Sequence, residues 1–290
     1  MALLTSSKTF TMAKEKLLSC KDELKNYQFW KAVRCEFLVT MLLIFVGCGS
    51  WTHSDNSSIR ELKIALCFGL AVATLVQCVG HISGAHLNPA VTMAMLVTRN
   101  LSILRAIFYM IAQCVGGIAG AGILYGLTPN ATYHSLGVAS VRDDMPLAQA
   151  FGMEFMITFI MVFTVFANVD PRRADMGSRS LAIGLSYTLG NLLALNTTGA
   201  CMNPARALGP ALVMNIWKHQ WLYWIGPLLG GIIGGFTYEY THDSSEQLQY
   251  FKRSFRRKKT AMQRSRSIHS SNSTVSTEMT FTPTSEDLVI

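Results

Sequence analysis

The sequence predicts an all-α membrane protein with six transmembrane helices and two half-helices arranged as an inverted repeat. Three observations support this fold class. Half of the 290 residues are hydrophobic and only 14% are charged, against about 25% in ordinary soluble domains. Long stretches contain no Lys, Arg, Asp or Glu, and two apolar segments that open with Asn-Pro-Ala are too short to cross a bilayer. These features exclude a soluble globular domain and a disordered chain.

The membrane-spanning elements follow from segment length, because a spanning helix needs roughly 20 mostly apolar residues. Six segments fit, at about residues 33–52, 62–80, 103–125, 148–168, 180–196 and 221–241. The shorter segments Asn88–Val97 and Asn203–Met214 each begin with Asn-Pro-Ala. Proline suits the first helical position, where its missing N–H costs nothing. Each short segment is therefore predicted to be a half-helix.

The distribution of Lys and Arg predicts that both termini are cytoplasmic, because short cytoplasmic loops carry an excess of these residues. Residues 1–28 form a polar, basic N-terminal segment without the apolar core of a signal peptide. Residues 29–242 form the membrane domain, and residues 243–290 form a cytoplasmic tail. Asn56 and Asn130 lie in Asn-x-Ser/Thr triplets that would then face outside and could be glycosylated.

The chain repeats itself. Glu36 precedes Asn88 by 52 residues, and Glu154 precedes Asn203 by 49 residues. Each half contains three spans and one half-helix, at about residues 33–125 and 148–241. An odd number of spans per half gives the halves opposite orientations, related by a pseudo-two-fold axis in the membrane plane. The half-helices are expected to enter from opposite faces and to meet near the midplane.

Two motifs carry a resemblance to a known family. Gly80–Thr92 reads GHISGAHLNPAVT and Gly199–Gly209 reads GACMNPARALG. Both resemble the signatures of the aquaporins (major intrinsic proteins), and the resemblance covers about residues 28–242. It implies the aquaporin fold, a channel domain over residues 29–242, and a passive pore for water that excludes ions and protons. It also implies a homotetramer with one pore per subunit and no cofactor or metal.

The centre of the pore is predicted at the paired motifs, formed by Asn88, Pro89, Ala90, Asn203, Pro204 and Ala205. Each Asn would stand at a half-helix N-terminus with its amide donors toward the lumen. The N-terminus of each half-helix carries roughly half an elementary positive charge. Cations would therefore be repelled at this point, and a water held by two donors would relay protons poorly.

A second barrier to ions is expected at Arg206, since a charged residue at membrane depth is a functional candidate by default. The resemblance places Arg206 in an extracellular selectivity constriction together with Phe68, Asn191 and Ala200. The water-selective branch usually has His at the position of Asn191. An insect subgroup that replaces this His passes glycerol and urea, whereas Ala207 and Ala211 differ from the glycerol-conducting branch. The residues thus predict water permeation and leave glycerol and urea open.

Two other pairs of polar residues are candidates. Glu36 and Glu154 occupy equivalent repeat positions, and the resemblance implies that they brace the half-helix loops by accepting backbone hydrogen bonds; proton relay is the alternative. His81 and His86 flank the cytoplasmic half of the pore and are candidates for its lining loop, or for simple hydrogen-bonded loop structure.

The composition of the chain changes in the tail, after about residue 243. Phe251–Arg266 interleaves aromatic and basic residues and contains 8 of the 25 Lys and Arg, a pattern that favours contact with anionic lipid headgroups over nucleic acid. Residues 267–290 are Ser/Thr-rich and are expected to be disordered.

Parts of the sequence are also compatible with functions other than a channel. A coupled secondary transporter shares the inverted repeat, but its lumen would need an ion-coupling acid besides the two glutamates. A non-conducting or gated relative with an adhesion or signalling role is a further alternative. An enzyme is not expected, since the sequence shows no nucleophile, metal cluster or phosphate loop. The expected location is the plasma membrane.

Overall fold

The computed structural model describes residues 21–51, 59–129, 135–171 and 177–242. Their helices follow one another along the chain as α2 (Tyr27–Gly49), α3 (Arg60–Ser83), α4 (Pro89–Val97), α5 (Ile103–Leu127), α6 (Leu147–Val169), α7 (Arg179–Ala194), α8 (Pro204–Met214) and α9 (Leu222–His242). This order agrees with the predicted fold class. The glycosylation triplets at Asn56 and Asn130 and the basic tail lie outside the described residues.

Local sequence signals fix several helix starts. The side chains of Ser102 and Ser178 accept hydrogen bonds from backbone N–H groups in the first turns of α5 and α7, as good N-caps do. Helix α3 continues to Ser83, three residues beyond the predicted end at residue 80, and stops at Gly84, whose φ of 89° is accessible to glycine. The irregular backbone before the first half-helix is therefore shorter than the sequence pattern indicated.

Four helices, α2, α3, α5 and α6, have the length and hydropathy of membrane spans among the described residues. Helix α7 has only 16 residues, and α9 has 21 residues that include Pro227 and five glycines. Small residues permit close helix packing in membranes, and α9 is rich in them.

The inverted repeat is visible in the packing of α5 and α9. A Cβ at Gly116 or Gly120 of α5 would collide with backbone carbonyl oxygens of α2, and a Cβ at Gly230 or Gly234 of α9 would collide with carbonyl oxygens of α6. The glycines of each pair are 114 residues from their counterparts. The third helix of each half therefore packs against the first helix of the same half in the same way.

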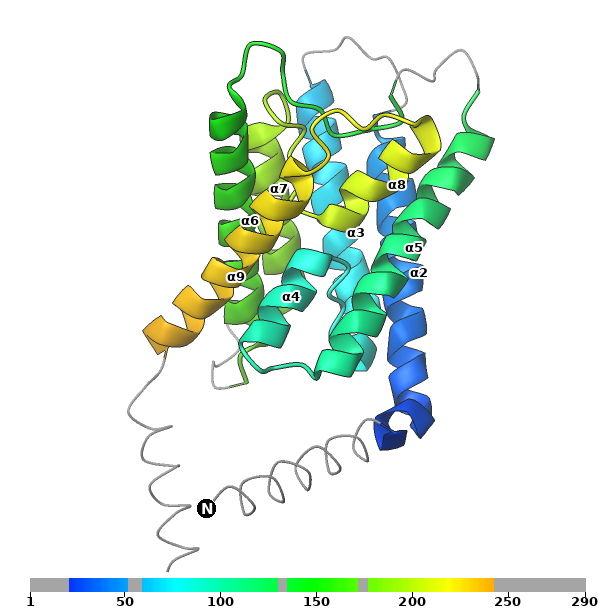
Figure 1. The fold of residues 1–290 in the computed structure, drawn as a ribbon, viewed down its shortest axis with the longest axis vertical. Helices are drawn as coiled ribbons and strands as arrows, with labels where there is room; N and C mark the ends of the chain where they lie inside the picture. Colours follow the sequence, from blue (N-terminus) through cyan, green and yellow to red (C-terminus); the bar gives the residue numbers. More distant parts are fainter. Residues whose placement is uncertain (1–20, 52–58, 130–134, 172–176, 243–290) are drawn as a thin grey trace, which may run out of the picture. The chain divides into compact units, whose positions relative to one another are not determined.

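The half-helices lie inside the bundle. Figure 1 shows α4 and α8 between the long helices, with their N-terminal ends toward each other. Gly117 of α5 lies against the Ala205 carbonyl at the start of α8, and Gly231 of α9 lies against the Ala90 carbonyl at the start of α4. Each third helix thus supports the half-helix of the opposite repeat.

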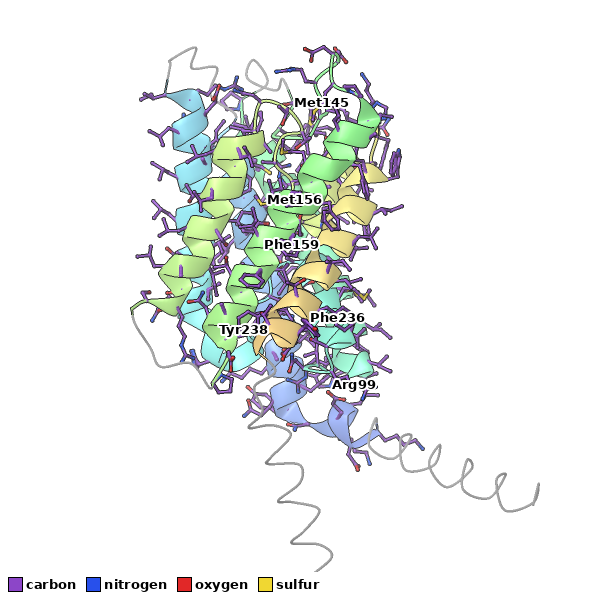
Figure 2. The ribbon with its side chains drawn as sticks, turned by 90° about the vertical axis from the view of Figure 1, so that its left-hand side faces the viewer. Arg99, Met145, Met156, Phe159, Phe236 and Tyr238 are labelled. Carbon is purple, nitrogen blue, oxygen red and sulfur yellow. The ribbon has the colours of Figure 1, made fainter. Side chains whose placement is uncertain are left out.

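The outward faces of the long helices are apolar. Figure 2 shows Met156 of α6 and Phe236 of α9, which are 49% and 48% exposed. Leucines at Leu70, Leu189 and Leu193 are exposed on α3 and α7. These side chains are apolar and exposed, as expected of a belt that contacts the hydrocarbon of a bilayer.

Glu23, which precedes α2, and Glu239 of α9 contact the same connection at one end of the bundle. Ser102 in the α4–α5 connection donates to the Glu23 carboxylate at 2.8 Å. Asn100 in the same connection donates to the Glu239 carboxylate at 3.2 Å. One short connection therefore contacts residues that precede α2 and residues near the end of α9.

Candidate pore

The two Asn-Pro-Ala motifs are joined by reciprocal hydrogen bonds. The Asn88 side-chain amide donates to the Met202 carbonyl at 2.8 Å, and the Asn203 amide donates to the Leu87 carbonyl at 2.9 Å. Each acceptor immediately precedes the other asparagine. The sequence predicts that these asparagines meet, but it does not show that one N–H of each is used to bind the opposite loop.

The same asparagines cap their half-helices. The Asn88 side-chain oxygen accepts from the Ala90 N–H at 2.8 Å, and the Asn203 oxygen accepts from the N–H groups of Ala205 and Arg206 at 3.0 and 3.3 Å. With the oxygen and one N–H engaged, each amide orients its second N–H. Both side chains are buried. The motif therefore holds one donor from each half-helix start in a fixed direction, beside two positive dipole ends.

A buried carboxylate binds the loop before each half-helix. Glu36 accepts from the Ser83 hydroxyl at 2.6 Å and from the backbone N–H groups of His86 and Leu87 at 3.0 and 2.9 Å. These three donors come from the end of α3 and the loop that leads to Asn88. These bonds satisfy backbone groups that no regular helix pairs, as buried polar groups require.

The second carboxylate repeats this pattern. Glu154 accepts from the Thr198 hydroxyl at 2.6 Å and from the N–H groups of Cys201 and Met202, each at 2.9 Å. Thr198, Cys201 and Met202 stand 115 residues after Ser83, His86 and Leu87. The geometry is that of a brace for each loop.

Two tyrosines complete the repeat. The Tyr109 hydroxyl of α5 donates to the Ser83 carbonyl, and the Tyr223 hydroxyl of α9 donates to the Thr198 carbonyl, each at 2.9 Å. Tyr109 was not singled out by sequence reasoning. Its 114-residue offset from Tyr223 was the available signal.

Among the described residues, the first half has a polar network without a counterpart in the second half. The Gln113 amide donates to the Glu36 carboxylate and to the Thr92 hydroxyl, each at 2.9 Å, and the Thr92 hydroxyl lies 3.0 Å from His86 Nδ1. The repeat-related positions of Gln113 and Thr92 are Pro227 and Ala207. The two loops are therefore braced unequally.

All four predicted constriction residues are buried, and the structure brings Arg206 and Phe68 into contact. Arg206 donates to the Gly137 carbonyl at 2.6 Å, and its guanidinium carbon lies 5.3 Å from the centre of the Phe68 ring. Ala200 is buried in the loop before Asn203, and the Asn191 amide donates to the Tyr187 carbonyl at 2.9 Å. Sequence reasoning missed Gly137, which belongs to the segment at residues 135–146 that folds back over the second loop.

Several polar atoms at this level have no partner among the described residues. They are Arg206 Nε and Nη2 and Asn191 Oδ1, all buried. A buried donor or acceptor without a partner costs free energy unless water or a solute satisfies it. Among the described residues, Arg206 thus keeps two unused donors and Asn191 keeps one unused acceptor.

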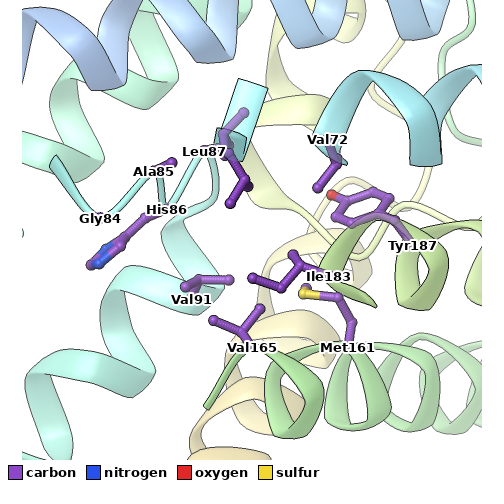
Figure 3. A pocket seen from close by; sticks show the side chains of 11 residues that line it. Val72, Gly84, Ala85, His86, Leu87, Val91, Met161, Val165, Ile183 and Tyr187 are labelled. Atoms are coloured by element: carbon purple, nitrogen blue, oxygen red, sulfur yellow. The ribbon is translucent and has the colours of Figure 1, made fainter. Parts of the chain in front are cut away.

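A cavity lies beside the first loop, and the four predicted constriction residues are not among those that line it. Its volume open to the centres of water-sized molecules is about 20 Å³, which exceeds the need of one water. Figure 3 shows the loop residues Gly84–Leu87 on one side and aliphatic side chains such as Val72 and Ile183 on the other. His86 lines the cavity. His81 instead belongs to the last turn of α3, and its side chain is exposed.

A helical bundle with two half-helices that meet beside a narrow, partly polar passage is the architecture of a membrane channel built from an inverted repeat. Comparisons with known proteins give the family. The chain belongs to the major intrinsic protein family, whose model matches residues 23–238.

Similar proteins and a solved structure agree with this family assignment. Aquaporin-4 of Mus musculus is 50% identical over 217 residues, which cover 73% of this chain and 67% of the relative. The lens fiber major intrinsic protein of Lithobates pipiens is 45% identical over 219 residues, covering 75% and 83%. The X-ray structure of the aquaglyceroporin from Plasmodium falciparum matches with a TM-score of 0.66 and 25% identity, covering 73% of this chain and 96% of that chain. These findings confirm the predicted aquaporin fold.

Proposed function

We propose that this protein is a passive water channel of the aquaporin type that also admits glycerol and urea at a lower rate. Family membership makes it a channel and not an enzyme. The observation that carries the proposal is the set of buried polar atoms on Arg206 and Asn191 that have no partner among the described residues. A separate cavity beside the first loop is large enough for one water molecule. The same family contains relatives named for water and for glycerol.

Permeation of glycerol and urea rests on Asn191. Asparagine lacks the ring of the histidine found in the water-selective branch, and Ala200 adds no bulk opposite it. The Asn191 carbonyl oxygen can accept from a solute hydroxyl or amide, while the Arg206 donors can bind its oxygen. The outer constriction would therefore be wider and still polar. The resemblance to the insect glycerol-permeable subgroup depends on this one position.

The test is solute flux in proteoliposomes that contain the purified full chain. We expect fast osmotic shrinkage in sucrose with a low activation energy, and a slower re-swelling in glycerol and in urea. Asn191→His should reduce the glycerol and urea rates severalfold and leave water flux nearly unchanged, because the ring narrows the constriction. Leu193→Val, on the exposed face of α7, is the matched control. Absence of water flux above protein-free vesicles would contradict the proposal and favour the non-conducting alternative.

The wider context is also proposed. A homotetramer in the plasma membrane follows from the family resemblance, with both termini in the cytoplasm. The common position of Glu23 and Glu239 beside one connection supports an even number of crossings. Contact of the basic tail with anionic lipid rests on the sequence of residues 251–266 alone.

A further inference from the structure

We infer that Tyr187 forms a second selectivity element, one helical turn inside the outer constriction, whose ring limits the size of solutes that cross the cytoplasmic half of the pore. This inference rests on the proposed function, because it concerns the passage of solutes through the same pore. It assigns the size limit to a residue on α7 that sequence reasoning did not single out.

Position is the first argument. Ile183, Tyr187 and Asn191 are spaced by four residues and so share one face of α7. All three are buried, whereas Leu185 and Leu189 between them are 48% and 60% exposed. Because a helix rises 1.5 Å per residue, the Tyr187 level lies about 6 Å along the helix from Asn191. The pore-facing stripe therefore has Asn191 at the outer constriction and Tyr187 next below it.

Lining is the second argument. Tyr187 borders the cavity together with Val72, and Figure 3 shows its hydroxyl directed inward among the lining side chains. The other side chains that the long helices contribute are aliphatic or methionine: Val72, Val76, Met161, Val165 and Ile183. The phenol is thus the bulkiest group and the one hydroxyl among the described residues that line this cavity.

The hydroxyl supplies the third argument. It is buried and has no hydrogen-bond partner among the described residues. The Asn203 side chain approaches it without meeting hydrogen-bond geometry. A buried phenol normally finds a partner, as Tyr109 and Tyr223 do in this protein. An unpartnered tyrosine at the cavity wall is explained when lumen water is its partner, and that places the ring at the edge of the water path.

Consequences for selectivity follow from the two levels together. Asn191 and Ala200 leave the outer constriction without bulk, so a solute larger than water can enter there. It must then pass between the Tyr187 ring and the opposite loop, in a cavity with room for little more than one water molecule. Glycerol flux is therefore limited by Tyr187 and not by the outer constriction.

The experiment compares water, urea and glycerol permeabilities of the full chain in proteoliposomes for the wild type, Tyr187→Val and Tyr187→Phe. Tyr187→Val removes the ring, and we expect the ratio of glycerol to water permeability to rise about tenfold, which corresponds to a barrier lower by about 1.4 kcal/mol. Tyr187→Phe retains the ring and should keep the wild-type ratio. Leu189→Val, on the exposed face of the same helix, is the control for helix packing.

The outcomes separate this inference from the proposed function. If the wild type conducts water and Tyr187→Val leaves the glycerol-to-water ratio unchanged, the inference is overturned and the water channel stands. If neither protein conducts water, both fail. Should Tyr187→Val not fold, Tyr187→Trp gives the opposite test, since a larger ring should lower the ratio; a ratio at or above the wild-type value would overturn the inference.

Discussion

Glu36 and Glu154 each accept from one hydroxyl and two backbone N–H groups, yet Glu36 has an additional donor in Gln113. Removing the charge at either site would leave part of this set unsatisfied. A glutamine in place of a glutamate brings an NH₂ group that faces at least one backbone N–H. The difference between the two sites lies in whether a neighbour can adapt.

Both Glu→Gln variants should lower the thermal unfolding temperature in detergent, and Glu154→Gln should lower it more. Gln113 can rotate its amide so that its oxygen accepts from the new NH₂ group at position 36, whereas position 154 has Pro227 at the equivalent place. One retained hydrogen bond is worth about 1 kcal/mol. The double variant Glu36→Gln with Gln113→Ala is the control, and it should remove the advantage. A larger loss for Glu36→Gln than for Glu154→Gln would contradict this account.

In the sequence, short motifs and equivalent repeat positions identify the motif asparagines and the two glutamates as candidates, whereas the constriction side chains are expected from the family resemblance. Prediction from the sequence did not reach Gly137, whose carbonyl accepts from Arg206. Backbone carbonyls leave no sequence signal, since any residue can supply one. Tyr187 was missed for a different reason: a tyrosine in an apolar span is compatible with ordinary packing until its hydroxyl proves unpartnered.

At the scale of helices, α5 shows which sequence features carry positional information. Apolar stretch length predicted its bounds within two residues, at 103–125 against Ile103–Leu127. The glycines of α5 could be recognised as packing residues, but the sequence did not show which of them are in close contact. Gly116 and Gly120 face α2, whereas a Cβ placed at Gly122 or Gly126 would have no neighbouring atom within 4 Å. Which glycines face a neighbouring helix depends on how α5 is rotated about its own axis, and the sequence does not show that rotation.

A pair of alanine substitutions in α5 tests this distinction. Gly120→Ala places a methyl group against the Met41 carbonyl oxygen, so α2 and α5 must separate, and overpacking of this kind typically costs about 1–3 kcal/mol. Gly122→Ala meets open space and should stabilise the helix by about 0.5–1 kcal/mol, as alanine does relative to glycine in a helix interior. Thermal unfolding of both variants, with the fraction that remains assembled, measures the effect. Equal stability of the two would show that the close contact of α2 and α5 at Gly120 is relaxed without cost.

At the scale of the whole membrane domain, we propose that the inverted repeat places two barriers to ions in series. One is the meeting point of α4 and α8, where both half-helix N-termini and both asparagine amides are directed toward the same region. The other is Arg206, which lies in α8 and reaches Phe68 and Gly137. Because both half-helices are needed to form the first barrier, it is a property of the repeat and not of one residue.

Two barriers in series predict how ion exclusion fails. Arg206→Val removes the guanidinium from the constriction, yet sodium conductance should stay at background while both positive helix ends remain. Adding Asn203→Asp preserves a helix N-cap but places a negative charge at the meeting point, and sodium current should then rise. Asn203→Asp alone is the control, since Arg206 would still repel cations. The measurement is sodium current under voltage clamp, normalised to the amount of each variant at the cell surface. Sodium current in Arg206→Val alone would mean that the arginine carries the whole barrier to cations.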